Sequence, residues 1–219
     1  MRFNEQGRSM IEMLGVLAIV GVLSVGGIAG YSKAMNKFKT NKLIEQVNMI
    51  STNVRTLYAS QKSYEGLKNG SAIRTGILPN EMYDANNTAS VNMDYTNSQA
   101  EITNAFAGNT IITTGSVKDT SANDHGAFII SMDKIPEASC VSIATTEWGG
   151  DAGGGLLAMA IVSGANAAST LLSDLTSVVN STAATDGVFV VSDGGLPVQV
   201  SNAAAICADA ENAIAWKYM

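Results

Sequence analysis

The chain of 219 residues has little of several residue types on which catalytic and metal sites depend. It contains one histidine, two cysteines and three prolines, and charged residues make up 15%, below the roughly 25% of an average globular domain. The single histidine, His125, has no His or Cys neighbour in sequence, which favours a turn residue over a ligand or a base. Cys140 and Cys207 lack the Cys-x-x-Cys spacing of a metal site. We therefore expect no cofactor, no metal and no enzymatic activity.

Glycine is abundant, but its clusters lack the patterns of ligand-binding loops. The stretch EWGGDAGGG, residues 147–155, has no Gly-Lys-Ser/Thr and is predicted to be a flexible loop without a nucleotide role. Together with SDGG, residues 192–195, it also lacks the regular acidic spacing of an EF-hand calcium loop. The low charge and an aromatic content of 6% suit a surface of uncharged polar groups, or one largely buried against copies of itself.

The charges are distributed unevenly along the chain. Residues 8–64 carry seven Lys or Arg and two Glu, whereas residues 65–219 carry five Lys or Arg and sixteen Asp or Glu. A basic stem thus precedes an acidic head. Either both are simply solvated, or stem and head attract one another within or between subunits. The acidic head argues against nucleic-acid binding, which needs a basic surface.

The first third of the sequence predicts one long helix, from Ser9 to about Tyr64, because no proline precedes Pro79. Residues 13–30, here called the apolar segment, contain no charge and span about 27 Å as a helix, close to the ~30 Å hydrocarbon core of a bilayer. Beyond this segment the apolar residues recur every three or four positions from Leu43 to Tyr58, the pattern of an amphipathic helix. We expect the first half to lie in lipid and the second half to pack on a soluble head.

Two simpler membrane interpretations fit this N-terminus less well. A cleaved secretory signal would need a small-x-small site and a turn after the apolar segment, and neither is present. A plain single-pass anchor would not need Glu12, a carboxylate at the edge of the bilayer. Lysines 33, 37, 39 and 42 follow the apolar segment and, by charge count alone, place the C-terminal side in the cytoplasm. A disulfide between the cysteines would place it on the opposite side.

The stretch GRSMIE, residues 7–12, followed directly by the apolar segment, resembles the type III signal of class-II prepilins, the precursors of type IV pilins. The resemblance implies that a prepilin peptidase cuts after Gly7 and methylates the new terminal amine of Arg8, a residue unlike the Phe, Met or Leu usual there. It further implies a leader of residues 1–7, a helix of residues 8–64 and a head of residues 65–219.

In this family the Glu at the fifth mature position, here Glu12, meets the N-terminal amine of a neighbouring subunit in the filament. An unpaired charge among apolar helices is costly, so such a pair would fix the register of each incoming subunit. The alternative is that Glu12 only caps the start of the helix. Glycines 15, 21, 26, 27 and 30 either permit close helix packing or weaken the helix so that part of it unwinds on assembly.

The head is predicted to be α+β, an antiparallel sheet against the long helix. Residues 65–125 indicate loops with one or two short elements. A central strand is expected at 126–132, followed by a short helix from Pro136 to Thr145. A second helix is expected at 156–179, bent near Gly164. A hairpin of 187–192 with 196–201 and a last strand in AIAWKYM, 213–219, complete the predicted head. The layout of KIPEASC and the late AIC resembles type IVb pilins, which implies a disulfide between Cys140 and a strand near Cys207.

These features predict a structural subunit of a type IV pilus, without enzymatic activity. The precursor would lie in the bacterial inner membrane and the mature chain in an extracellular filament for adhesion, aggregation, motility or conjugative contact. Its expected partners are copies of itself, the prepilin peptidase and the inner-membrane assembly machinery, with no nucleic acid. The alternatives are a minor pilin, a type II secretion pseudopilin, or a membrane-anchored binding module that never polymerises.

Overall fold

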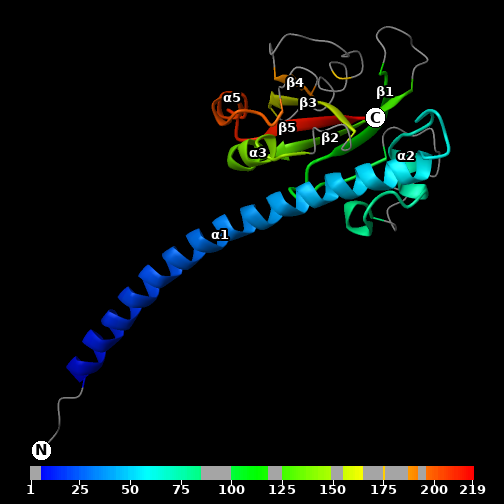
Figure 1. The fold of residues 1–219 in the computed structure, drawn as a ribbon. Helices are drawn as coiled ribbons and strands as arrows, with labels where there is room; N and C mark the ends of the chain where they lie inside the picture. Colours follow the sequence, from blue (N-terminus) through cyan, green and yellow to red (C-terminus); the bar gives the residue numbers. More distant parts are fainter. Residues whose placement is uncertain are drawn as a thin grey trace, which may run out of the picture. The chain divides into compact units, whose positions relative to one another are not determined.

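A computed structural model describes residues 6–84, 100–117, 125–148, 155–164, 175, 187–191 and 196–219. The chain divides into two compact units, Met1–Lys39 and Thr40–Met219. The first unit contains the N-terminal part of helix α1. Among its described residues, the second contains the rest of α1 and a five-stranded sheet with three shorter helices and a 3-10 turn (Figure 1).

The predicted long helix is present as α1, Gln6–Tyr58, which ends six residues before the expected limit near Tyr64. The chain turns after Tyr58, where the Gln61 amide donates to the Tyr58 carbonyl at 2.8 Å. Tyr64 instead joins the head: its amide donates to the His125 carbonyl, and its ring lies 4.9 Å from that of Phe128. Tertiary contacts of Tyr64 thus end a helix that the local sequence would allow to continue.

The sheet has the order β1-β2-β5-β3-β4, and each neighbouring pair is antiparallel, as predicted (Figure 1). Its strands are β1 Thr110–Gly115, β2 Ala127–Ile135, β3 Leu156–Ser163, β4 Val188–Val190 and β5 Asn212–Tyr218. The predicted strands at 126–132 and 213–219 are therefore confirmed, as β2 and β5. The central position belongs to β5, which pairs with both β2 and β3.

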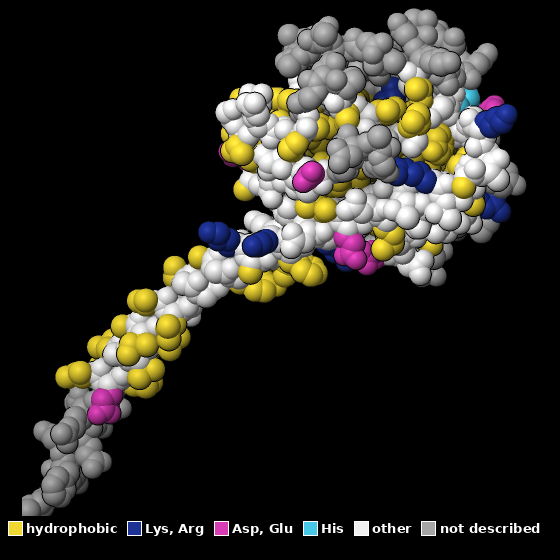
Figure 2. All heavy atoms as spheres, in the orientation of Figure 1, with side chains coloured by type: hydrophobic (Ala, Val, Ile, Leu, Met, Phe, Trp, Pro, Cys, Tyr) yellow, Lys and Arg dark blue, Asp and Glu magenta, His cyan; other side chains and the backbone are white. Residues whose placement is uncertain are grey.

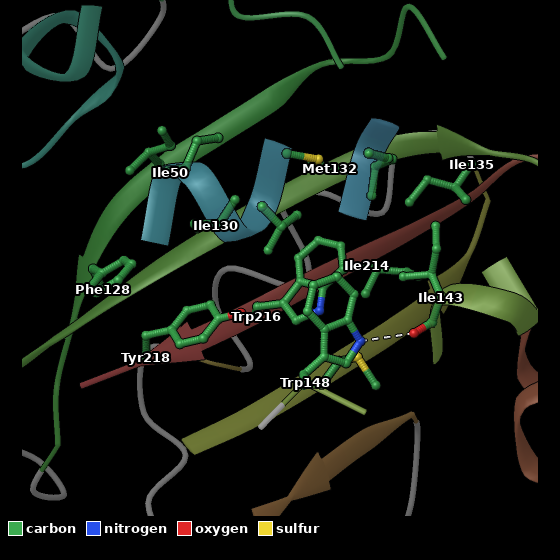
Figure 3. Close-up of a cluster of buried hydrophobic side chains, with 14 of the residues drawn as sticks. Ile50, Phe128, Ile130, Met132, Ile135, Ile143, Trp148, Ile214, Trp216 and Tyr218 are labelled. Atoms are coloured by element: carbon green, nitrogen blue, oxygen red, sulfur yellow. Dashed lines mark hydrogen bonds between the residues drawn. The ribbon is translucent and has the colours of Figure 1, made fainter. Parts of the chain in front are cut away.

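The two faces of the sheet carry side chains of different size. The larger ones, including Ile130 and Trp216, share one core with Leu43, Val47, Ile50 and Val54 of α1, all of them fully buried (Figure 3). Each such aliphatic side chain contributes about 1.5–3 kcal/mol when removed from water. The opposite face carries Ile129 with alanines of β3 and β5, packed against Leu175. Alternation along each strand produces this division, because successive side chains point to opposite faces.

Two tryptophans fill the core beneath the short helix α3, Glu137–Ala144. Their rings, Trp148 and Trp216, lie 5.1 Å apart at an interplanar angle of 58°, and the Trp148 indole donates to the Ile143 carbonyl at 2.9 Å (Figure 3). Helix α3 begins after Pro136, with Glu137 in its first turn and Thr145 at its C-terminal cap, which confirms the helix predicted there.

The helix predicted for residues 156–179 is wrong over its first part, because Leu156–Ser163 forms strand β3. The sequence LLAMAIVS consists largely of good helix formers, but its place between β5 and β4 in the sheet outweighs that preference. Ala158 and Ala160 lie on the face packed against Leu175. Gly164, where a bend was expected, follows the end of the strand with a φ of +105°. Residues 165–174 and 176–179 lie outside the described part of the chain.

The predicted hairpin of residues 187–192 with 196–201 is also wrong. Val188–Val190 does form β4, but it pairs with β3. The second segment leads into helix α5, Val200–Ile206. The residues SNAAAI favour a helix, and Ala203 and Cys207 are buried against the head, so α5 turns one side to the core. Residues 192–195 of the expected turn, like residues 149–154 of the expected flexible loop, lie outside the described residues.

Three short elements occupy the region 65–125, where one or two were expected: α2 Asn69–Arg74, the 3-10 turn η1 Asn80–Met82, and β1. Residues 85–99 and 118–124 of this region are outside the described ranges.

The side chain of Asn69 hydrogen-bonds to the backbone of β1 at the edge that faces away from β2. Its Oδ1 accepts from the Ile112 amide at 2.7 Å, and its Nδ2 donates to the carbonyls of Thr110 and Ala100 at 3.0 and 2.8 Å. Asn69 thus replaces a neighbouring strand at a sheet edge.

Replacing Asn69 with Ala is expected to lower the free energy of unfolding by about 2–4 kcal/mol. The change removes three hydrogen bonds and leaves the buried Ile112 amide without its acceptor. Urea unfolding of the full chain in detergent, followed by tryptophan fluorescence, measures the loss. Asn202→Ala on the exposed side of α5 is the control, with an expected change within about 0.5 kcal/mol. Equal effects of the two substitutions would contradict the role of Asn69.

Candidate assembly segment

The apolar segment of α1 is exposed on all sides within its unit. Its ten large aliphatic and Met side chains are between 51% and 75% exposed: Met13, Leu14, Val16, Leu17, Ile19, Val20, Val22, Leu23, Val25 and Ile28. Hydrophobic side chains cover most of this part of the helix in Figure 2. By length and composition α1 is able to cross a membrane: its most apolar 18-residue window has a mean hydropathy of 2.2, and none of that window is buried. A surface of this kind requires lipid or other apolar helices around it.

The polar groups inside the apolar segment are satisfied within the helix itself. The hydroxyl of Ser24, the only polar side chain of the segment, donates to the Val20 carbonyl at 2.7 Å. Such internal pairing is what a hydrocarbon environment demands. A Cβ atom added at Gly15, Gly21, Gly26, Gly27 or Gly30 would meet no atom within 4 Å. No contact within the chain therefore requires these glycines, and both close packing by another helix and local weakening of the helix stay open as predictions.

Glu12 stands one residue before the apolar segment and is exposed. The structure gives it no ion pair or hydrogen bond among the residues whose side chains it describes, which begin at Met10. Gly7 and Arg8 lie in the first turn of α1, which starts at Gln6, whereas Glu12 lies beyond that turn. Cleavage between Gly7 and Arg8 would make Glu12 the fifth residue of the chain, close to the first turn, so both pairing with a neighbouring amine and stabilisation of the helix start stay predictions.

The second part of α1 is held to the head by polar contacts as well as by its buried stripe. The Thr40 hydroxyl donates to that of Ser139 on α3 at 2.9 Å, and Asn53 Nδ2 donates to the Ile77 carbonyl at 2.7 Å. Gln46 Oε1 accepts from the Ala105 amide at 3.1 Å, and Lys42 forms an ion pair with Glu81, also at 3.1 Å. These contacts make the helix from Thr40 onward part of the head.

An aromatic contact secures the same helix near its C-terminal end. The guanidinium of Arg55 lies 5.2 Å from the centre of the Tyr218 ring on β5, within the range of a cation–π interaction. Burial raises the pKa of the Tyr218 hydroxyl, although the charge of Arg55 and a hydrogen bond with Ser51 act in the opposite direction. Tyr218 is therefore un-ionised at physiological pH and serves as a packing group.

The disulfide between Cys140 and Cys207 is confirmed, with both residues fully buried and their Cα atoms 5.8 Å apart. Cys140 lies on α3, next to Ser139, which bonds to α1. Cys207 caps the C-terminal end of α5 instead of lying on a strand, which corrects the expected layout. The bridge therefore joins two short helices, and β5 begins shortly after it at Asn212. In the described part of the chain, no three His, Cys, Asp or Glu residues come together as a metal site would require.

The fold is that of type IV pilins. A type IVb pilin from Salmonella typhi superposes with a TM-score of 0.50 at 17% identity, covering 81% of this chain and 98% of that one. TcpA, a type IV pilin from Vibrio cholerae El Tor, gives the same TM-score at 18% identity and covers 83% and 99%. These likenesses establish the fold, and they agree with the type IVb-like head expected from the cysteine layout.

The chain belongs to the Bundlin family, whose model matches residues 32–191. Two curated relatives, each named the major structural subunit of bundle-forming pilus, come from Escherichia coli O127:H6 and Escherichia coli O111:H-. Each is 27% identical over 150 residues, which cover 68% of this chain and 69% of the relative. The resemblance to type IV pilins that the N-terminal sequence suggested is thereby confirmed by the head as well.

Proposed function

We propose that this chain is the structural subunit of a type IV pilus and polymerises through the N-terminal part of α1. The observation that carries this proposal is the apolar segment, exposed on every side and with one carboxylate, Glu12, at its edge, on a chain whose head has the pilin fold. Copies of this helix, packed together, would bury the exposed side chains of one another in a filament core. The heads would then form the outer surface of the filament.

Before assembly, the same segment would hold the subunit in the inner membrane. A prepilin peptidase would remove residues 1–7 by cutting between Gly7 and Arg8 and would methylate the new amine. The remaining chain would comprise residues 8–64, which contain α1 from Arg8 onward, and the head of residues 65–219. The disulfide supports an exported head, because such bonds persist in oxidising compartments. The membrane assembly machinery would take up the processed subunit from this state.

A major pilin is favoured over a minor pilin or a secretion pseudopilin. The two curated relatives are major subunits, and the family match extends through most of the head as well as the second half of α1. Electron microscopy of fibres sheared from the cell surface, with mass spectrometry of their content, tests the proposal. We expect this chain to be the principal component. Fibres in which it is scarce would indicate a minor subunit, and a cell surface without fibres would favour a membrane-anchored binding module.

Replacing Gly7 with Leu is expected to leave uncleaved precursor in the membrane, because a bulky side chain would stand directly before the bond that is cut. Intact-mass analysis of membrane protein distinguishes the precursor from a chain that starts at Arg8. Gly21→Leu, within the apolar segment and free of neighbouring atoms, is the matched control and should be cleaved normally. A wild-type mature chain that starts at Met1 or beyond Gly30 would contradict this assignment of the junction.

A further inference from the structure

Two lysines lie directly beyond the apolar segment on one side of α1. Lys33 and Lys37 are four positions apart in sequence, so their side chains neighbour each other on the helix surface. Both are exposed, and neither has an ion-pair partner among the described residues. Lys42, the next lysine but one, differs in that it lies in the head unit and pairs with Glu81 at 3.1 Å. Lys42 thus has an anionic partner within the head, whereas Lys33 and Lys37 have none among the described residues and are available to another anion.

The depth of these lysines matches the headgroup layer of a bilayer. If the apolar segment spans the hydrocarbon, Lys33 lies about 4.5 Å beyond Gly30 along the helix, and Lys37 about 10 Å beyond it. The polar layer on each side of a bilayer is on the order of 5–8 Å thick, and the flexible stem of a lysine lets its ammonium reach across that distance. Tyr31, also exposed, occupies the interfacial level at which aromatic residues gather.

The side of the membrane on which Lys33 and Lys37 lie helps to identify what they bind. The disulfide requires an oxidising compartment, which places the C-terminal side of α1 outside the cytoplasm. Lysines close to a membrane span favour the cytoplasmic side, so Lys33 and Lys37 oppose the topology that the chain must adopt. Two cations at a position that does not help insertion point to a ligand on the exported side, and at this depth the available anions are lipid phosphates.

We propose that Lys33 and Lys37 form a binding site for the phosphodiester of an anionic phospholipid in the outer leaflet of the inner membrane, and so retain the subunit there before assembly. The site rests on the membrane stage of the proposed function. The two ammonium groups supply charge and hydrogen-bond donors to one phosphate. Figure 2 shows basic side chains on the part of the long helix that follows its apolar portion. The bond is reversible, since the subunit must leave the lipid when it enters the filament.

Native mass spectrometry of the full chain tests this proposal. The protein is released from detergent micelles that contain equal amounts of phosphatidylglycerol and phosphatidylcholine, and the lipids that remain bound are counted. We expect the wild type to retain phosphatidylglycerol over phosphatidylcholine by about tenfold to thirtyfold, the effect of two lysines at a lipid surface. Lys33→Gln/Lys37→Gln should retain the two lipids almost equally. The control, Lys62→Gln/Lys134→Gln, removes the same charge from two exposed lysines of the head and should keep the preference.

Three outcomes would overturn the proposal. The first is equal retention of both lipids by the wild type, and the second is an equal loss of preference in the control, which would indicate net charge alone. The third is an unchanged lipid preference in Lys33→Gln/Lys37→Gln combined with fewer fibres, which would assign the lysines to acidic heads of other copies. The lipid measurement needs no filament, so its failure is distinct from failure of the pilus proposal, which the absence of wild-type fibres would reveal.

Discussion

Replacing Glu12 with Ala is expected to abolish filament formation and to leave a full pool of processed subunit in the membrane. In the proposed filament, Glu12 pairs with the terminal amine of a neighbouring subunit amid exposed apolar side chains. Removal of one partner leaves the other charge uncompensated in a low-dielectric core, and such a loss typically costs about 3–5 kcal/mol at each contact. Every subunit in the filament would bear that cost, so even a loss at the lower end should prevent growth.

The Gln variant separates charge pairing from a capping role. Glu12→Gln keeps the shape and a hydrogen-bond acceptor but loses the charge, so it should assemble almost as poorly as Glu12→Ala. If Glu12 only stabilised the start of α1, either substitution would cost about 1 kcal/mol or less and leave fibres nearly intact.

The measurement is the yield of sheared fibres, compared with the amount of processed subunit in the membrane fraction. Glu45→Ala is the matched control, because Glu45 is an exposed carboxylate on the same helix but lies in the part held to the head. Its fibre yield should equal that of the wild type. Normal fibres from Glu12→Ala, with cleavage demonstrated, would refute the pairing and favour a plain membrane anchor.

Removal of the disulfide by Cys140→Ala is expected to lower the free energy of unfolding of the head by about 4 kcal/mol. In the chain-entropy model, this is the effect of opening a loop whose ends are 67 residues apart. The loss should be transmitted to α1, since Ser139 beside Cys140 bonds to Thr40 in the buried contact between α3 and the long helix. Fewer surface fibres should result, whereas leader cleavage, on the opposite side of the membrane, should proceed normally.

Urea unfolding with and without reductant measures this effect. Reduced wild type should unfold at the lower urea concentration found for Cys140→Ala, and Cys207→Ala should match both. Ser201→Ala, on the exposed side of α5 near Cys207, controls for local disturbance and should leave the midpoint unchanged. Two thiols that react with a labelling reagent in exported, unreduced wild type would contradict the bridge.

The elements that sequence reasoning predicted correctly are those with an unambiguous local signal. Helix α1 has a long apolar run and a clear amphipathic stripe, β2 a compact β-prone run, and α3 a proline at its start. The two wrong elements have different causes: in the first, local preference and tertiary position disagree, whereas in the second the helix preference of SNAAAI was not recognised. Residues 156–163 favour a helix by composition, but their place between β5 and β4 in the sheet makes them a strand. Residues 196–201 were expected as a strand, but the last two of them begin helix α5, Val200–Ile206.

The candidate site was predictable to a different extent at each residue. Gly7 and Glu12 were singled out because their spacing before an apolar segment is a signal in itself, and their roles stay predictions. The bridge between the two cysteines was expected for an exported head and is confirmed. Asn69 gave no signal, since a single Asn in a polar region has no pattern that marks it as the partner of a strand edge. The pairing of Lys42 with Glu81 likewise required the three-dimensional structure, because 39 residues of chain separate them.

The central place of β5 sets an order of events for the newly made chain. Strand β5 follows the other four strands in sequence, yet it lies between β2 and β3 in the sheet. A nascent chain that ends before Asn212 therefore has two separate strand pairs, and the edges of β2 and β3 that would pair with β5 lack their hydrogen-bond partners. The head cannot close cooperatively until the ribosome has passed these last residues, and Cys207 emerges only just before them. A chain exported as proposed would therefore complete its sheet only after Asn212–Tyr218 had reached the far side of the membrane.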